Sequence, residues 1–404
     1  MDLLENPVRP YAWGSRTVIP ELLGEPSPSA HPQAELWLGA HPADPSQVVH
    51  CDGHRSSLLE DVAADPAGAL GADRAGRWRE RLPFLLKVLA ADEPLSLQAH
   101  PSARQAEDGF ERENAAGIPV DAPQRNYRDP SHKPELICAL TPFHALVGFR
   151  DPAATVELLR ALDVPVLGAY VELLAAQPDP DGLRALFTTW ITLPQSMLDV
   201  LVPAVQEGAV RLAADASSPW QVEARSALEL SERYPGDAGV LAALLLNRVS
   251  LVPGEALYLP AGVLHAYLSG AGVEIMANSD NVLRGGLTPK HVDVPELARV
   301  LDFAAPAPPV LTGRPDGPWR CYDTPAEEFR LRRWEGDASG GPLPVPDGGA
   351  RILLCTAGSA CVRGAGKEMK LRRGAALWLP ARDRGISVLA GNGHTQLFLA
   401  GDGL

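Results

Sequence analysis

The sequence lacks the features of a membrane or secreted protein. No stretch of about 18 or more apolar residues occurs, and the N-terminal MDLLENPVRPYAWG carries acids where a signal peptide has a basic and then an apolar run. Basic residues are in the minority, with 36 Lys and Arg against 50 Asp and Glu and a formal net charge of −14. We therefore expect a cytoplasmic protein with neither a membrane nor a nucleic acid as its partner.

Cysteine and the common catalytic motifs are also scarce. The five cysteines are odd in number and form no C-x-x-C pair, which argues against a disulfide framework and a thiolate zinc site: Cys51, Cys138, Cys321, Cys355 and Cys361. The sequence has no Walker loop, G-x-G-x-x-G, G-x-S-x-G or H-E-x-x-H motif, so nucleotide-binding, serine-hydrolase and zincin activities lack support. Any metal must use nitrogen and oxygen ligands.

What is present is the texture of several domains. A chain of 404 residues with 39 Pro and 37 Gly has room for two or three domains with many turns. Changes in periodicity predict the following division: residues 1–150 and 235–303 as one discontinuous β-barrel domain with a short helix over Asp293–Asp302, 151–234 as an α-helical insert, 304–319 as a Pro-rich linker, and 320–404 as a C-terminal barrel. Within 1–150 we expect mostly short strands.

An internal repeat indicates the fold of the two barrels. LVPGEALYLPAGVLHAY at 251–267 aligns with LRRGAALWLPARDRGIS at 371–387, an offset of 120 residues, and both read as strand, Gly turn, strand, Pro turn, strand. The predicted fold class is mainly β with a helical insert: two cupin-like jelly-roll barrels plus an α-helical domain. Gly385 stands where the first copy has His265, so we expect a structural, degenerate C-terminal barrel.

Four residues in the first barrel are candidate metal ligands. Gln98 and His100 stand two apart in LSLQAHP, a spacing that points both side chains to one face of a strand. Glu135 and His265 lie in strand-and-turn segments of the same barrel. Two imidazoles, a carboxylate and an amide oxygen suit zinc, and less exclusively Fe, Mn or Co. Spacing alone leaves a structural role for these histidines equally open.

A set of basic residues accompanies these candidates on an otherwise acidic chain: Lys87, His132, Lys133, Arg284 and Lys290. Lys87 lies within the apolar LPFLLKVL, where a lysine is rarely buried without a partner. Basic groups beside a metal favour a small anionic substrate, most simply a phosphate ester.

Together, several ordered blocks resemble the type I mannose-6-phosphate isomerase (phosphomannose isomerase) family. The blocks are YAWGS, QAELWLGAHP, LPFLLKVLAADEPLSLQAHP, HKPELICAL, FHALVGFR, YPGDAGVLAALLLNRVSLVPGEALYLPAGVLHAYLSG and VEIMANSDNVLRGGLTPKHVD. The resemblance is dense from Tyr11 to Phe149 and from Tyr234 to Phe303, and weak in the helical insert and the C-terminal barrel. It implies a monomeric enzyme with one Zn²⁺ per chain. Its substrate would be a phosphorylated hexose, because the family interconverts D-mannose 6-phosphate and D-fructose 6-phosphate through an enediol.

The resemblance also implies roles for individual residues. It assigns zinc to Gln98, His100, Glu135 and His265, substrate or phosphate contacts to Ser96, Lys133 and Lys290, and catalytic positions near the sugar to Arg284, His132, Asp280, Glu274 and Lys87. The general base stays open between His132, Glu274, Asp280 and a metal-bound water. Two other classes also stay open, a cupin-type Fe(II) oxygenase and a non-catalytic sugar-phosphate-binding protein.

Overall fold

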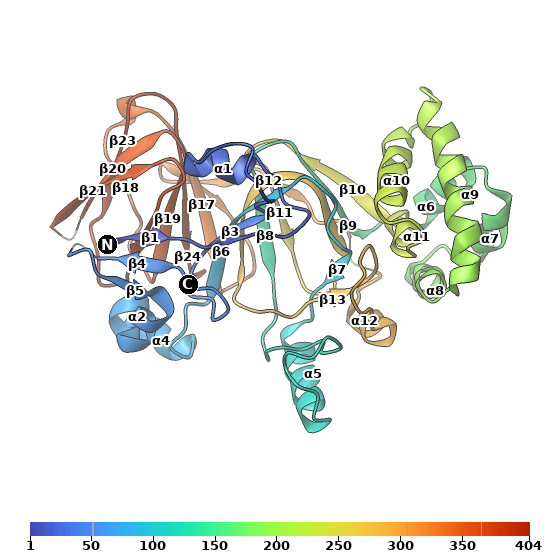
Figure 1. The fold of residues 1–404 in the computed structure, drawn as a ribbon, viewed down its shortest axis with the longest axis horizontal. Coiled ribbons are helices and arrows are strands. Elements are labelled where there is room, and N and C mark those ends of the chain that lie inside the picture. The colour runs from blue at the N-terminus through green and yellow to red at the C-terminus, as the bar shows by residue number, and fades with distance from the viewer. Residues whose placement is uncertain (51, 305, 365) are drawn as a thin grey trace.

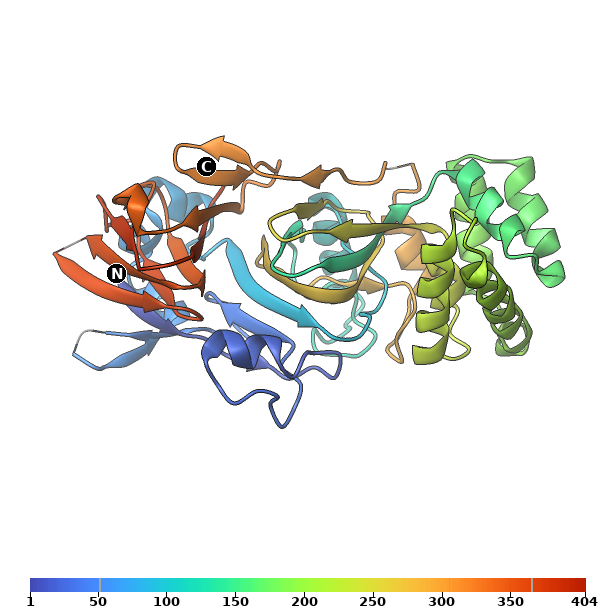
Figure 2. The ribbon, with the colours of Figure 1, turned by 90° about the horizontal axis from the view of Figure 1, so that it is seen from above.

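The computed structural model describes residues 1–50, 52–304, 306–364 and 366–404. Within these ranges the chain forms sheets of 11, 9 and 4 strands and a group of helices, arranged along one axis (Figures 1 and 2). Helices lie at one end, the 11-stranded sheet lies in the middle, and the sheets of 9 and 4 strands lie at the other end. Extensive β-sheet with a separate helical segment is the architecture predicted from the sequence.

The 11-stranded sheet is antiparallel in all its pairings and is built around one long strand. Its strands are β2 (Val8–Arg9), β3 (Glu35–Leu38), β6 (Phe84–Ala91), β7 (Gln98–Ala99), β8 (Glu135–Ala139), β9 (Phe143–Phe149), β10 (Leu246–Leu251), β11 (Ala256–Leu259), β12 (His265–Ala277), β13 (Leu283–Arg284) and β14 (Val310–Leu311). β12 pairs with β6, β7, β8 and β9. Every residue of β6 is buried, which explains its nearly continuous apolar sequence.

Of the other two sheets, the one with nine strands contains both the first and the last strand. The 9-stranded sheet contains β1 (Asp2–Glu5), β4 (Gln47–Val49), β5 (Arg55–Ser57), β15 (Arg314–Asp316), β16 (Trp319–Tyr322), β17 (Arg330–Gly336), β19 (Arg351–Ala357), β22 (Ala376–Leu379) and β24 (Thr395–Gly401), and the 4-stranded sheet contains β18 (Leu343–Pro344), β20 (Ser359–Gly364), β21 (Lys367–Arg372) and β23 (Ser387–Ala390). β1 lies between β22 and β4. This pairing departs from the predicted division, which placed all of residues 1–150 with the first barrel, because pairing between distant strands leaves no local pattern in a sequence.

The two large sheets share a core. Val88 of β6 and Ile275 of β12 belong to one buried cluster with Ile352 of β19 and Phe398 of β24. The side chains on the other face of β6 and β8 belong to a different buried cluster, which includes Leu89 and fills the interior of the 11-stranded sheet. Alternation along the strands therefore sends one face of this sheet toward its neighbour and the other toward its own interior.

Helices fill the predicted insert and continue slightly beyond it. They are α6 (Pro152–Ala161), α7 (Gly168–Ala176), α8 (Pro180–Ile191), α9 (Gln195–Ala214), α10 (Gln221–Arg233) and α11 (Gly239–Ala243). Asp151 caps α6 and Asp179 caps α8, each followed by a proline in the first turn. Within the described ranges, no single helix is long and apolar enough to cross a membrane, and only the pair α8 and α9, bent by 112°, passes such a test together.

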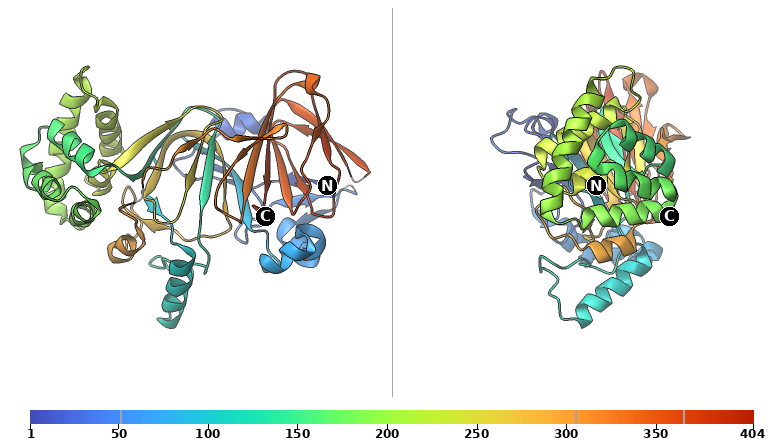
Figure 3. Two further views of the ribbon diagram at one scale, coloured as in Figure 1. Left: turned by 180° about the vertical axis from the view of Figure 1, so that it is seen from behind. Right: turned by 90° about the vertical axis from the view of Figure 1, so that its right-hand side faces the viewer.

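The expectation of mostly strands in residues 1–150 is wrong for part of that region. The helices outside the insert are α1 (Val18–Leu23), α2 (Leu58–Ala64), α3 (Pro66–Leu70), α4 (Ala72–Arg77), α5 (Ala103–Ala115) and α12 (Val294–Val300). α5 begins with a capping box, in which Ser102 accepts from the N–H of Gln105 and the Gln105 side chain accepts from that of Ser102. α5 lies between His100 and Glu135 in sequence and projects from the 11-stranded sheet (Figures 1 and 3).

The structure confirms the strand and turn pattern of the internal repeat. β11 at Ala256–Leu259 corresponds to β22 at Ala376–Leu379, and the preceding Gly254 and Gly374 have φ of 89° and 82°. The Pro-rich segment predicted as a linker carries β14, which pairs with β11, and β15. The described cysteines Cys138, Cys321, Cys355 and Cys361 are free thiols, and Cys51 lies outside the described residues.

Candidate active site

Three of the four predicted metal ligands meet inside the 11-stranded sheet. His100 follows β7, Glu135 is the first residue of β8, and His265 is the first residue of β12. Their ligand atoms all lie within 4.8 Å of one another, and all three side chains are buried. Glu135 Oε1 lies 3.3 Å from His100 Nε2, and Glu135 Oε2 lies 3.6 Å from His265 Nε2. Residues far apart in sequence thus present two nitrogens and a carboxylate to one point.

Backbone carbonyls orient both imidazoles. His100 Nδ1 lies 2.8 Å from the carbonyl oxygen of Asn281, and His265 Nδ1 lies 3.0 Å from that of Val263. A carbonyl only accepts hydrogen bonds, so each Nδ1 carries the proton and each Nε2 keeps a lone pair. His100 Nε2 is buried without a hydrogen-bond partner. An orphaned ring nitrogen beside a carboxylate is the arrangement that a metal ion would satisfy.

The protonation states of this cluster suit a divalent metal. Burial lowers the pKa of His100, only partly opposed by Glu135. Burial alone would raise the pKa of Glu135, but His100 and Lys133 outweigh it and hold that pKa well below its ordinary value. A neutral imidazole and an ionised carboxylate are the forms that bind metals, and two nitrogens with one oxygen fit the donor set of zinc.

Gln98 lies beside the cluster through strand pairing. Gln98 of β7 is directly opposite His265 of β12 on one side and Arg284 of β13 on the other. Side chains directly opposite in antiparallel strands project to the same face. The predicted fourth ligand and the predicted catalytic arginine therefore share the face that carries His265.

A buried ion network lies on neighbouring strands. Lys87 of β6 is directly opposite Glu274 of β12, and its Nζ lies 3.5 Å from both Glu274 Oε2 and Glu35 Oε1. Tyr267 donates to Glu274 Oε1 at 2.8 Å. Burial alone would lower the pKa of Lys87, but Glu35 and Glu274 raise it instead. Burial raises the pKa of Glu274, with Lys87 only partly opposing it. The sequence expectation that Lys87 needs a partner is met by two carboxylates.

Basic side chains gather near the metal cluster, and among the described residues some of them have no carboxylate within ion-pair distance. Among the described residues, Arg128, Arg284 and Lys290 form no ion pair with a carboxylate. The pKa of Arg284 is lowered by burial and then by Arg128, and that of Lys290 by burial, Arg284 and Arg128. Lys133 Nζ lies 3.4 Å from Glu135 Oε1, next to the metal cluster. These cations repel one another and would be stabilised by an anion.

The remaining predicted residues have separate surroundings. His132 Nε2 lies 2.6 Å from Glu328 Oε1, a residue of the segment between β16 and β17. Asp280 lies 3.4 Å from His41, and the hydrogen bond from His41 lowers the pKa of Asp280. Ser96 is half-buried just before β7. His132 therefore contacts the C-terminal half of the chain.

Sequence reasoning did not single out three residues that contact the site. Asn281 accepts from His100 through its carbonyl, Glu35 binds Lys87, and Tyr267 binds Glu274. Glu35 carried a usable signal, because an acid within the buried strand ELWL needs a partner as much as Lys87 does. Asn281 carried none, since His100 is distant in sequence. Tyr267 carried none either, because it lies seven residues from Glu274 in one strand, an odd spacing that predicts opposite faces.

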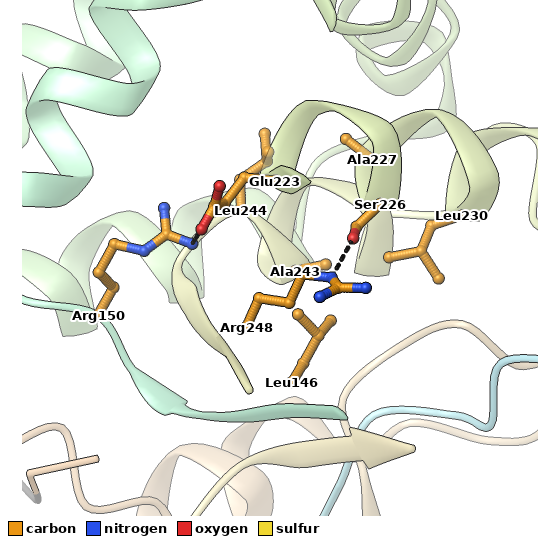
Figure 4. A pocket seen from close by; sticks show the side chains of 9 residues that line it. All are labelled: Leu146, Arg150, Glu223, Ser226, Ala227, Leu230, Ala243, Leu244 and Arg248. Carbon is orange, nitrogen blue, oxygen red and sulfur yellow. Dashed lines mark hydrogen bonds and ion pairs between the residues drawn. The ribbon is translucent and has the colours of Figure 1, made fainter. Parts of the chain in front are cut away.

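A small hollow lies at the junction with the helical insert, away from this site. It has a volume of about 10 Å³ and lies beside Leu146, Ala227 and Leu230 (Figure 4). Arg248 donates to Ser226 at 2.9 Å across one side. This volume holds about one water molecule, and its lining includes none of the predicted site residues. It is a packing defect between barrel and insert and not a substrate pocket.

Comparison with known proteins places these observations in one family. Residues 1–152 match the model of the phosphomannose isomerase type I catalytic domain. Over 402 residues the chain is 41% identical to mannose-6-phosphate isomerase of Escherichia coli (strain K12), covering 98% of each. It is 34% identical to mannose-6-phosphate isomerase 2 of Arabidopsis thaliana, covering 98% of this chain and 92% of the relative.

Solved structures agree over the whole length. A mutant of phosphomannose isomerase from Salmonella typhimurium superposes with a TM-score of 0.91 at 37% identity, covering 100% of both chains. A zinc-bound crystal structure of mannose 6-phosphate isomerase superposes with a TM-score of 0.89 at 36% identity, covering 100% of this chain and 99% of that one. The chain belongs to the type I phosphomannose isomerase family.

Proposed function

We propose that the chain is a zinc-dependent mannose-6-phosphate isomerase that interconverts D-mannose 6-phosphate and D-fructose 6-phosphate through an enediol. One observation carries the proposal: the ligand atoms of His100, Glu135 and His265 converge within 4.8 Å of one another, inside a family whose solved members include zinc-bound enzymes. The unpaired cations Arg284 and Lys290 add the chemistry that a phosphorylated sugar requires.

His100, Glu135 and His265 would hold the zinc, with Gln98 as the fourth ligand. Bound zinc would polarise the sugar oxygens and so lower the cost of forming negative charge on them. The same ligands accept other divalent ions, so metal content is part of the test.

Proton transfer falls to a carboxylate in the barrel interior. An aldose-ketose isomerase removes the proton at C2 and returns one to C1. Glu274 is the best base among the candidates, because its raised pKa makes it more basic than an exposed carboxylate and Tyr267 fixes its orientation. Asp280, with its lowered pKa, is a weaker base, and His132 is engaged by Glu328.

The substrate phosphate would bind the basic residues near β13. Arg284 and Lys290 would donate to it, Lys133 would lie between the phosphate and the metal ligand Glu135, and Ser96 would add a hydroxyl. Arg284 shares a face with Gln98, so it can also stabilise charge that develops on the sugar oxygens.

For the fold we propose two cupin-like jelly-roll barrels, joined to an α-helical insert. The catalytic barrel would comprise most of 1–150 with 235–303, followed by the linker 304–319 and the C-terminal barrel 320–404. Strands β1, β4 and β5 are assigned to the second barrel because they pair there. We further propose that the protein is cytoplasmic and monomeric. Light scattering at working concentration tests the oligomeric state.

The deciding experiment is turnover of mannose 6-phosphate by the purified protein as isolated, after chelation, and after zinc is restored. Activity that disappears and returns with zinc supports the proposal. Oxygen uptake with Fe(II), or a full metal site without turnover, would replace it by an oxygenase or a sugar-phosphate-binding protein.

The base is tested separately by exchange of the C2 proton with solvent in three variants: Glu274→Gln, Asp280→Asn and His132→Gln. Glu274→Gln should abolish exchange while zinc stays near one per chain. Normal exchange in that variant would refute the assignment.

A further inference from the structure

Asn281 contacts both the metal ligand His100 and the loop 128–133, which carries Arg128, His132 and Lys133. It is fully buried, with 0% of its surface exposed, and belongs to the segment between β12 and β13. Its carbonyl oxygen is the acceptor for His100 Nδ1 at 2.8 Å. That bond fixes which nitrogen of His100 faces Glu135.

The side chain of Asn281 bonds the backbone on the other side. Its Oδ1 accepts from the N–H of Arg128 at 2.7 Å and of Asp129 at 3.3 Å. Its Nδ2 donates to the carbonyl of Asp129 at 2.7 Å and that of Ser131 at 2.8 Å. Both halves of the amide are therefore used to hold one turn of chain, 128–131.

The same turn is tied back to the Asn281 segment by Asp129. Its carboxylate accepts from Ser279 Oγ and from the N–H of Asp280, both at 2.8 Å. The turn 128–131 and the segment around Asn281 thus form one hydrogen-bonded unit. The Arg128 side chain extends from this unit and is exposed to solvent. Burial lowers the pKa of Arg284 and Lys290 most, and the positive charge of Arg128 lowers both further.

We propose that Asn281 is a positioning residue that couples the metal ligand His100 to the turn 128–131, so that the metal keeps a fixed separation from Arg128 in this turn and from the phosphate-binding Lys133 that follows it. The role of this coupling in substrate binding rests on the proposed function, whereas the hydrogen bonds that make the coupling do not. A hexose phosphate can span only a limited range of distances between its C1–C2 end and its phosphate, so a unit that sets the separation of metal and cation favours the phosphorylated sugar in its reactive geometry.

The first test is Asn281→Ala, with Asn278→Ala as the matched control. Asn278 lies in the same segment, but its amide donates to Leu82 at 3.3 Å, away from the turn. Asn281→Ala keeps the main-chain carbonyl that accepts from His100 but removes the side-chain hydrogen bonds that hold this carbonyl in place. Zinc should therefore be released to a chelator about tenfold faster, the lower end of what outer partners of metal ligands contribute. The amides of Arg128 and Asp129 should also exchange their hydrogens faster. Asn278→Ala should change neither.

Catalysis supplies a readout that simple destabilisation would not give. At saturating zinc, kcat of Asn281→Ala should recover toward the wild-type value, while KM for mannose 6-phosphate stays several-fold raised because the turn remains loose. Equal changes in both asparagine variants, or unchanged zinc release in Asn281→Ala, would overturn the proposal.

A measurement on the unmodified chain covers the case in which Asn281→Ala does not fold. Removing zinc from the wild type should speed exchange of the Arg128 and Asp129 amides, while the Gly182 amide, held by Asp179 in the distant insert, stays unchanged. Equal exchange with and without zinc would refute the coupling. Zinc release and exchange need no turnover, so a chain inactive on mannose 6-phosphate would refute the proposed function and leave this test intact.

Discussion

The buried network around Lys87 gives a prediction whose sign differs between its members. Lys87 Nζ lies 3.5 Å from one oxygen of Glu35 and one of Glu274. At an effective dielectric constant of about 20, each contact is worth about 5 kcal/mol before desolvation. The network carries two acids and one base, so removing the base and removing one acid are not equivalent changes.

Lys87→Met leaves two carboxylates buried and unpaired, which costs about 3–5 kcal/mol of unfolding free energy. Glu274→Gln leaves a balanced pair of Lys87 and Glu35, and its side chain can still accept from Tyr267. We expect that variant to stay within about 1 kcal/mol of the wild type. The double variant Lys87→Met with Glu274→Gln should be more stable than Lys87→Met alone.

The assay is urea unfolding of metal-free protein, followed by tryptophan fluorescence at pH 7 and pH 5. A carboxyl group whose folded pKa is raised binds more protons in the folded than in the unfolded state, so it destabilises the fold as pH rises. The deficit of Lys87→Met should therefore be larger at pH 7 than at pH 5, because the folded state binds protons at Glu274 more readily than the unfolded state as pH falls. A double variant no more stable than Lys87→Met, or a deficit independent of pH, would refute the electrostatic account.

Three further predictions concern other parts of the chain. Gly286→Ala should lower Tm strongly, because the φ of Gly286 is 118° and an added Cβ would lie 2.6 Å from Gly239 Cα. Gly285→Ala should be tolerated, since the nearest atom to its added Cβ is a leucine methyl at 3.2 Å. Equal shifts in Tm for the two variants would contradict this reasoning. Glu328→Gln should cost about 1 kcal/mol at neutral pH. Burial would raise the pKa of Glu328, but His132 outweighs it and lowers that pKa, so the difference from wild type should disappear as pH falls below the ordinary value of 4.5, and a constant difference would show another cause. Zinc at about 1,000 times its Kd should stabilise the chelated protein by about 4 kcal/mol in thermal unfolding, and an unchanged Tm would argue against a site formed only in the folded state.

Local patterns in the sequence predicted much of the fold. The repeat around Gly254 and Gly374 predicted matching turns and strands, and these are present. The Ser102–Gln105 spacing of a capping box is the local signal that would have predicted α5. Pairing of β1 with β22 could not be predicted, because register between distant strands depends on complementary surfaces and not on any short motif.

For the site, the sequence indicated residue types better than their connections. The period of two in LSLQAHP placed Gln98 and His100 as a pair, and His100 meets Glu135 and His265 as expected. Asn281 could not be found in this way, because it acts through a main-chain carbonyl and through contacts with main-chain atoms, which any residue possesses.

The position of β1 also bears on how the chain is synthesised. Leu4 pairs with Ala376, which is synthesised 372 residues later (376 − 4). At about 5–20 residues per second, one edge of β1 waits on the order of 20–75 s for its neighbour. A fragment that ends before β22 would expose that edge, so the catalytic half cannot be cut out of this chain without leaving an unpaired strand behind.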